Sequence, residues 1–198
     1  MTTIDVFALL DELRAIARNG LTFARDPYDR ERYERLLEIA TRSYEELLGL
    51  PAGEALERFR RELGYVTNKL GADAAIFDDQ ERVLLVRRSD DRRWGLVSGW
   101  VEPNEAPDQT VVREVEEETG LHAVVDDLVG VFARPAGAAY GPHSAVAVVY
   151  LCSVTGGELR PSHEVLDIRS WPLDEVDRWH KNHELYARAA LASWQRRS

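Results

Sequence analysis

Residues 99–121 read GWVEPNEAPDQTVVREVEEETGL, and this stretch decides how the rest of the chain is interpreted. A proline at its start and a glycine just past its end predict a helix over residues 107–119. Glu114, Glu117 and Glu118 then project from one face, because residues three and four positions apart are neighbours on a helix. Adjacent carboxylates repel one another, and a divalent cation with a preference for oxygen ligands, Mg²⁺ or Mn²⁺, removes that cost. The spacing is therefore compatible with a metal site.

The other residues of this helix have separate predicted places. Val115 is expected in the core, and Glu116 on the opposite side from the carboxylate face, in solvent. Arg113 can pair with Glu117, four residues on, or with Glu105 in the preceding loop. Glutamate-rich helix faces are usually only solvated surface, so the spacing alone does not predict chemistry.

Composition restricts the classes of protein to which the chain can belong. It has 198 residues, 25 Lys plus Arg, 35 Asp plus Glu and 44% hydrophobic residues, which gives a formal net charge of −10. This balance predicts a folded protein and argues against nucleic-acid or membrane partners, which need a basic surface. If the substrate is itself an anion, a divalent metal is the usual means of holding it.

Several sequence features bear on location and covalent structure. Residues 145–152 form the longest apolar run, which is too short to span a bilayer, and the N-terminus does not resemble a secretory signal. We therefore expect a cytoplasmic protein. Cys152 is the only cysteine, so an intrachain disulfide is excluded, and we expect a packed core thiol.

Apolar residues recur at helical spacing before residue 66, which predicts a small helical domain over residues 1–66. The first helix is expected to end at Asn19-Gly20. The second is expected to begin at Asp26-Pro27, with the aspartate as N-cap. Leu50-Pro51 separates it from a short third helix. Three short helices bury little by themselves, so we expect them to dock onto the rest of the chain or onto a second copy.

Strand-like spacing follows over residues 67–198, the second predicted domain. Strands are expected at 72–77, 83–86, 94–97, 124–132, 145–154 and 168–171. A turn is expected at Gly156-Gly157, and a closing helix over residues 182–197. Strands interrupted by isolated helices predict an α+β or α/β sandwich.

The opening stretch also fits a longer pattern, G-x5-E-x7-R-E-U-x-E-E-x-G-U, in which U is an aliphatic residue. All seven fixed letters and both aliphatic positions are present. Composition alone would give such a match on the order of once in a million chains. The pattern is the signature of the Nudix hydrolases, which this chain resembles. The resemblance implies an αβα sandwich with a mixed β-sheet, in which the signature forms a loop, a helix and a loop.

The resemblance further implies hydrolysis of a nucleoside diphosphate linked to another group, with Mg²⁺ or Mn²⁺ as the cofactor. The positions that resemble the family's metal-binding carboxylates are Glu114, Glu117 and Glu118. Arg113 and Glu105 resemble the pair that orients them. The backbone carbonyl of Ser98 falls where the family often has a further metal ligand, although Val97-Ser98-Gly99 replaces the usual Pro-Gly-Gly.

Residues 16–35 resemble the helical extension that precedes the Nudix domain in a bacterial subgroup similar to CDP-choline pyrophosphatases. Residues 64–67, 157–158 and 161–164 resemble the same subgroup. In that subgroup the extension is associated with dimer formation. The resemblance therefore implies a homodimer and a substrate similar to CDP-choline.

Residues outside the signature complete the predicted site. Such enzymes often use a carboxylate outside the helix as a base or further ligand, and here the candidates are Glu164 first and Asp167 second. Arg87 and Arg134 are candidates for contact with the phosphates. Trp100 is a candidate for stacking on a base, with packing as the alternative role.

Other features of the sequence are less informative. His180 and His183 lie three residues apart, but we expect no ligand cluster around them and hence no zinc site. The chain has no G-x-G-x-x-G and no G-K-[ST] motif, so dinucleotide-fold and P-loop interpretations lack support. Residues 134–143, which include Tyr140, are expected to line the part of the site that selects the substrate.

Two alternatives to a CDP-choline hydrolase remain open. One is a pyrophosphatase for ADP-ribose or another nucleoside diphosphate sugar. The other is a non-catalytic module that binds a nucleotide as a signal. A sensing module would usually have lost signature carboxylates, so their retention favours catalysis.

Overall fold

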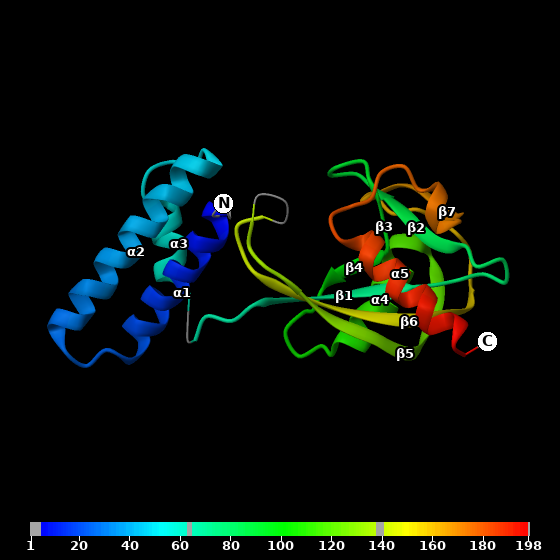
Figure 1. Ribbon diagram of the computed structural model, residues 1–198, viewed down its shortest axis with the longest axis horizontal. Helices are drawn as coiled ribbons and strands as arrows, with labels where there is room; N and C mark the ends of the chain where they lie inside the picture. Colours follow the sequence, from blue (N-terminus) through cyan, green and yellow to red (C-terminus); the bar gives the residue numbers. More distant parts are fainter. Residues whose placement is uncertain (1–4, 63–64, 138–140, 198) are drawn as a thin grey trace. The chain divides into compact units, whose positions relative to one another are not determined.

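The computed structural model describes residues 5–62, 65–137 and 141–197. They form two compact units, one made of residues up to 69 together with 134–145, and one made of residues 70–133 and 146–198 (Figure 1). The division of the chain into domains at residue 66 stays a prediction. In the part of the chain that the structure describes, no helix has both the length and the apolar character needed to cross a membrane.

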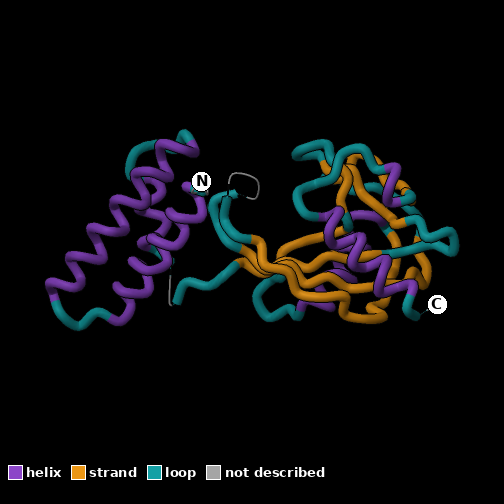
Figure 2. The backbone as a smooth tube through the Cα atoms, in the orientation of Figure 1, coloured by secondary structure: helices purple, strands orange, loops and turns teal. Residues whose placement is uncertain are grey.

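The helical unit contains α1 (Val6–Phe23), α2 (Pro27–Leu48) and α3 (Glu54–Arg60) (Figure 2). As predicted, Asp26 caps α2: its side chain accepts from the Tyr28 N–H at 2.6 Å, and Pro27 takes the first helical position. The two long helices pack through a core that contains Leu37, Ala40 and Tyr44.

The predicted end of the first helix at Asn19-Gly20 is wrong, because α1 continues to Phe23. A Cβ atom on Gly20 would lie 2.4 Å from the ring of Tyr33 in α2. The glycine therefore permits close contact between two helices instead of ending one. Leu63 and Gly64, which the sequence reading placed near the end of this unit, lie outside the described residues.

The second unit contains two sheets, with strand orders β4-β1-β6-β5 and β3-β2-β7. Its elements, in chain order, are β1 (Lys69–Ala75), β2 (Val83–Arg88), β3 (Trp94–Gly95), β4 (Val97–Trp100), α4 (Pro107–Thr119), β5 (Leu121–Arg134), β6 (Ala145–Gly157), β7 (Val165–Trp171), a 3-10 turn (Leu173–Glu175) and α5 (His183–Gln195). Lys69, Arg134 and Ala145 belong to the first unit, so β1, β5 and β6 each have one end residue there.

Helices cover both faces of these sheets. In β1, Ala72 and Ala74 share a core with Val111 and Val115 of α4, whereas Ala75 belongs to a second core that contains Tyr186, Ala187 and Ala190 of α5. Alternate residues of a strand point to opposite faces, so one strand serves both cores. The prediction of an αβα sandwich is confirmed.

The predicted turn at Gly156-Gly157 is wrong, because β6 extends through both residues. Gly157 has φ +91°, and a Cβ atom there would lie 2.4 Å from the carbonyl oxygen of Gly120. The end of β6 thus passes directly beside the end of the signature helix. β5 likewise begins at Leu121, three residues earlier than predicted.

Candidate active site

The signature helix α4 is fixed by its ends and by its apolar face. Pro107 takes its first turn, and Gly120, with φ +74°, ends it. Val111 and Val115 are fully buried beneath it. The opposite side carries the exposed Glu116, as the helical period predicts.

Arg113 joins three carboxylates of the signature. Its Nε and Nη2 donate to the two oxygens of Glu105 at 2.8 and 3.0 Å. Its Nη1 donates to Oε1 of Glu114 at 2.7 Å and to Oε2 of Glu117 at 3.0 Å. The Arg113 hydrogen bonds, with a further one from the Thr110 hydroxyl, lower the pKa of Glu105 to about 2. Both partners that the sequence allowed for Arg113 are therefore present at once.

Glu118 is the buried member of the carboxylate face, with 6% of its surface exposed. Its Oε2 is buried and has no hydrogen-bond partner among the described residues. Burial raises its pKa to about 8, opposed by the charge of Arg88 and reinforced by the charges of Glu114 and Glu164, while the Ser98 N–H also favours the charged form. A buried oxygen without a partner is costly, and a bound cation would supply one.

The strand beside α4 brings backbone atoms close to these carboxylates. Ser98 lies in β4, opposite Asp73 of β1. A Cβ atom on the next residue, Gly99, would lie only 1.8 Å from Oε1 of Glu114. The glycine is therefore needed for Glu114 to lie against the backbone of β4. This burial raises the pKa of Glu114.

Glu164 joins the cluster from a separate loop. The Ser162 N–H donates to the carbonyl oxygen of Glu118 at 3.2 Å, which ties this loop to the end of α4. The charge of Glu164 helps to raise the pKa of both Glu114 and Glu118, so its carboxylate is near enough to act on both. Asp167 instead forms an ion pair with Arg169 at 2.8 Å. The structure thus brings the first candidate base to the site and gives the second another partner.

The arginines of β2 differ from the sequence reading. In the strand register, Arg87 lies opposite Trp94 of β3 and opposite Asp167 of β7. Its Nε is buried without a hydrogen-bond partner among the described residues. Arg88 is one of five arginines that are dense in the sequence for an acidic chain, but Arg87 and Arg134 were favoured over it for contact with phosphates. Its positive charge opposes the rise in the pKa of Glu118, and it holds Asp90 through two hydrogen bonds of 3.1 and 3.0 Å. A register shift between the two arginines separates their environments, and it leaves no signal in the sequence.

The other predicted substrate contacts are less closely tied to the carboxylates. Trp100 is 54% exposed, and its carbonyl oxygen accepts from Arg113 at 3.4 Å. Arg134 belongs to the first unit, whereas the carboxylates belong to the second. Tyr140 lies outside the described residues. The roles of Trp100 and Arg134 in substrate binding stay predictions.

One group of three possible metal ligands within 4.8 Å of one another occurs in the described residues, and it is Asp90, Asp91 and His180. The expectation of no ligand cluster around His180 is therefore wrong. The aspartates come from the loop after β2. They are far from His180 in the sequence, so no spacing rule predicts that the three residues meet. These groups already have partners, since Arg88 binds Asp90 and Nδ1 of His180 lies 2.7 Å from Asp91. The signature carboxylates lie farther apart, with the Arg113 guanidinium between two of them.

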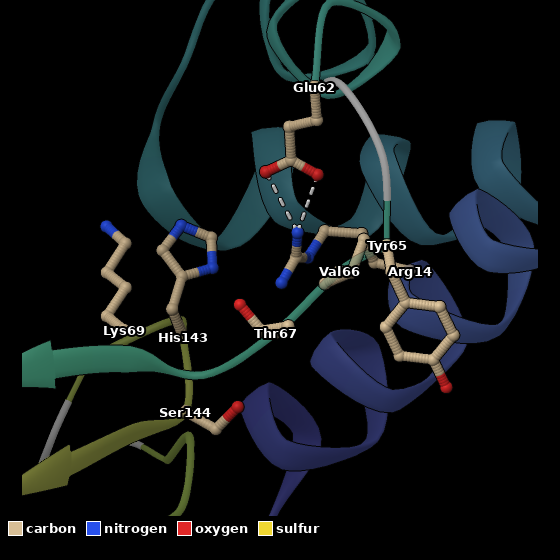
Figure 3. Close-up of a pocket in the computed structure, with 8 residues that line it drawn as sticks. All are labelled: Arg14, Glu62, Tyr65, Val66, Thr67, Lys69, His143 and Ser144. Atoms are coloured by element: carbon tan, nitrogen blue, oxygen red, sulfur yellow. Dashed lines mark hydrogen bonds and ion pairs between the residues drawn. The ribbon is translucent and has the colours of Figure 1, made fainter. Parts of the chain in front are cut away.

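A cavity of about 310 Å³ lies within the helical unit (Figure 3). Arg14 crosses it to both oxygens of Glu62, at 3.0 and 2.8 Å, and also binds Asp11. Its lining contains none of the signature residues. The candidate active site is therefore the carboxylate cluster of the second unit and not this cavity.

Two family models match the sequence. The model described as the NUDIX domain matches residues 67–193. The model described as a UDP-X-like, N-terminal oligomerisation domain matches residues 5–59. Together they account for both the sandwich and the helices before it.

Individual proteins agree with the models. A protein of Bacillus subtilis (strain 168) named "Putative ADP-ribose pyrophosphatase YjhB" is 30% identical over 165 residues, 83% of this chain and 79% of that one. A solved UDP-X diphosphatase is 25% identical with a TM-score of 0.60, and the match covers 98% of each chain. An ADP-ribose pyrophosphatase from Streptococcus suis 89-1591 is 27% identical with a TM-score of 0.55, over 65% of this chain and 93% of that one.

Proposed function

The chain belongs to the Nudix family and is a pyrophosphohydrolase, and from this premise we propose that Glu114, Glu117 and Glu118 hold a divalent metal ion for hydrolysis of a nucleoside diphosphate linked to a second group. The observation that carries the proposal is the buried Oε2 of Glu118, which has no hydrogen-bond partner among the described residues. The charges of Glu114 and Glu164 act on the same carboxyl group, so three carboxylates contribute negative charge to one region. Clustered oxygen ligands of this kind suit Mg²⁺ or Mn²⁺.

Each side chain has a role that follows from its contacts. Arg113 holds Glu105, Glu114 and Glu117 in place through its guanidinium fork. The carbonyl of Ser98 is available as a further metal ligand beside Glu118. Bound metal supplies neutralisation of the pyrophosphate oxygens and a water molecule of lowered pKa.

Glu164 is the proposed general base. Its side chain is 63% exposed, which leaves it accessible to water while its charge acts on Glu114 and Glu118. A carboxylate in this position accepts a proton from the attacking water as the water oxygen bonds to one phosphorus, while the bond from that phosphorus to the bridging oxygen breaks and the other phosphate group leaves with that oxygen. Arg88, on the other side of Glu118, is placed to balance negative charge at the same point.

We propose a nucleoside diphosphate linked to another moiety as the substrate class, with CDP-choline as the favoured member. The named relatives support the class, since one is a UDP-X diphosphatase and two are named for ADP-ribose. ADP-ribose and nucleoside diphosphate sugars are therefore the principal alternative substrates.

The test is a substrate panel at equal concentrations, containing CDP-choline, ADP-ribose, a UDP-sugar and a nucleoside triphosphate, each with Mg²⁺, with Mn²⁺ and with a chelator. Products are identified by mass, so that the cleaved bond is known. We expect a nucleoside monophosphate and a phosphorylated second group, formed only with metal. Tight binding without turnover across the panel would instead support the nucleotide-sensing alternative.

We further propose that the helical unit forms a homodimer. Its matching family model is described as an oligomerisation domain, and α1 and α2 leave Ile16, Phe23 and Ile39 exposed, with Phe23 at 68%. Apolar side chains of this size are commonly covered by a partner. Light scattering of the wild type and of a Phe23→Asp variant tests the assignment, which predicts a dimer that the aspartate weakens.

A further inference from the structure

Two ionisable residues outside the carboxylate cluster are buried on the opposite side of the sheet. His183, the first residue of α5, is 1% exposed, and Asp73 in β1 is 2% exposed. The ring of His183 lies 4.8 Å from that of His180 and 5.7 Å from that of Tyr186, and the apolar core on this side of the sheet includes Ala75 and Val149. Ionisable groups in such an environment are costly unless specific partners satisfy them.

The partners of His183 define its protonation. Its Nδ1 accepts a hydrogen bond from the Leu96 N–H at 3.0 Å, so this nitrogen carries no proton. The proton of the neutral ring is then on Nε2, which lies 3.5 Å from Oδ1 of Asp73. Asp73 thus favours the one tautomer that can accept from Leu96.

These contacts act on the segment that leads to the candidate metal site. Leu96 lies between β3 and β4, two residues before Ser98. Asp73 lies directly opposite Ser98 in the pairing of β1 with β4. A Cβ atom on Gly95 would lie 2.9 Å from Nδ1 of His183, so the absence of a side chain there allows the ring to reach the backbone.

The chain around His183 is joined to the same segment by its backbone. The His180 N–H donates to the carbonyl oxygen of Trp94 at 2.7 Å, and the Trp94 N–H donates to that of Arg178 at 2.8 Å. The His183 N–H in turn donates to the carbonyl oxygen of His180 at 2.9 Å. The start of α5 and residues 94–96 are therefore one hydrogen-bonded structure.

We propose that His183 and Asp73 are positioning residues, which fix the backbone of residues 96–98 so that the Ser98 carbonyl can bind metal and the Ser98 N–H can bind Glu118. This inference rests on the proposed function, because His183 and Asp73 can position a metal ligand only if metal binds at the Ser98 carbonyl and the signature carboxylates. Neither side chain touches the metal or substrate. They act through the Leu96 amide, from the face of the sheet opposite to α4.

Three substitutions separate the hydrogen bond between Leu96 and His183 from the 3.5 Å contact between His183 and Asp73. Asp73→Asn places an amide N–H donor near Nε2 of His183, which favours the tautomer with its proton on Nδ1. In that tautomer the Nδ1–H group and the Leu96 N–H point at each other and cannot form a hydrogen bond. His183→Gln keeps a polar group near Asp73 but removes the acceptor for Leu96. His183→Asn does the reverse, because its oxygen occupies the place of Nδ1. Leu173→Ala is the control, since this buried residue belongs to the core on the same side of the sheet and has no side-chain donor or acceptor.

The measurement is Mn²⁺ binding to the full-length protein without substrate, by titration calorimetry, together with the ¹⁵N shifts of His183 and the thermal unfolding midpoint. We expect Asp73→Asn and His183→Gln to weaken Mn²⁺ binding about 10-fold or more, as loss of groups that orient metal ligands does elsewhere. His183→Asn should stay within about threefold of wild type by the same reasoning, and Leu173→Ala should lower the unfolding midpoint without changing Mn²⁺ binding.

Equal Mn²⁺ binding by His183→Gln and His183→Asn would overturn the proposal, and so would a wild-type shift showing the proton on Nδ1. These results come from the histidine variants and the wild type, so they test the positioning role of His183 even if Asp73→Asn does not fold. Failure of the proposed function has a different signature. In that case wild-type protein binds no Mn²⁺, or binds it unchanged after Glu118→Gln, and this inference falls with it.

Discussion

Replacement of Glu118 by Gln separates the role of its charge from the role of its shape. The side chain is buried, and its Oε2 has no hydrogen-bond partner among the described residues. Gln retains the volume and removes the charge. If Glu118 is a metal ligand, turnover should fall by about 100-fold or more, because a neutral amide is a poor ligand for Mg²⁺.

The same substitution should stabilise the metal-free protein at neutral pH. Burial raises the pKa of Glu118 from 4.5 to about 8. The unfolded chain therefore releases this proton near pH 4.5, and the folded chain keeps it to about pH 8. Stability falls as the pH rises through this window, by about 3 kcal/mol between pH 4.5 and pH 7. Gln does not titrate, so the variant should lack this fall.

Urea unfolding in EDTA at pH 5 and at pH 7.5 measures the stability effect, and turnover with saturating Mg²⁺ measures the catalytic effect. Glu116→Gln is the matched control, because Glu116 is exposed on the other side of the same helix. It should leave both quantities unchanged. Turnover of Glu118→Gln within about threefold of wild type would refute the ligand assignment. If the free energy of unfolding changed with pH in the same way in the wild type and in Glu118→Gln, the argument that burial raises the pKa of Glu118 would be refuted.

Three further results follow from single contacts. Gly99→Ala places a Cβ atom 1.8 Å from Oε1 of Glu114, so this carboxylate must move, and we expect steady-state turnover to fall about 10-fold or more while the circular dichroism spectrum is unchanged. Although burial opposes it, interactions with His143, Arg14 and Ser144 hold the pKa of Asp11 well below its usual range. Asp11→Asn should therefore lower the free energy of unfolding in urea by about 3 kcal/mol at pH 7, and by less as the pH falls below about 4, where the unfolded chain gains the proton. Burial raises the pKa of Cys152 to about 12, so its thiol should react with a colorimetric thiol reagent only after unfolding, and rapid labelling of the native protein would contradict this.

The sequence was most informative where local rules operate. Pro107 and Gly120 mark the ends of α4 because a proline lacks an N–H and a glycine accepts positive φ, and both properties belong to the residue alone. The pairing of Arg113 with Glu105 and Glu117 likewise follows from spacing on one helix and its preceding loop. The fold class followed from the alternation of strands and helices.

Features that depend on distant contacts were not predictable. Gly20 has the local character of a helix end, and only the ring of Tyr33 in another helix explains why α1 continues past it. Arg88 and Arg87 are adjacent, and alternation places Arg88 on the face of β2 that carries Leu84 and Val86, but only the packing of that face against α4 shows which arginine acts on Glu118. His183 lies 87 positions from Leu96, so no spacing rule connects them.

The net negative charge of the chain opposes the binding of a negatively charged substrate at its site. An acidic protein repels an anionic pyrophosphate, and the carboxylate cluster adds to that repulsion. The two nearby cations already have carboxylate partners, since Arg113 binds Glu105 and Arg88 binds Asp90. These two cations are therefore partly neutralised, and we expect the attraction at the carboxylate cluster to come chiefly from bound metal. A metal ion held by Glu114, Glu117 and Glu118 supplies it at one point, so the affinity for substrate should depend on metal concentration far more steeply than on monovalent salt.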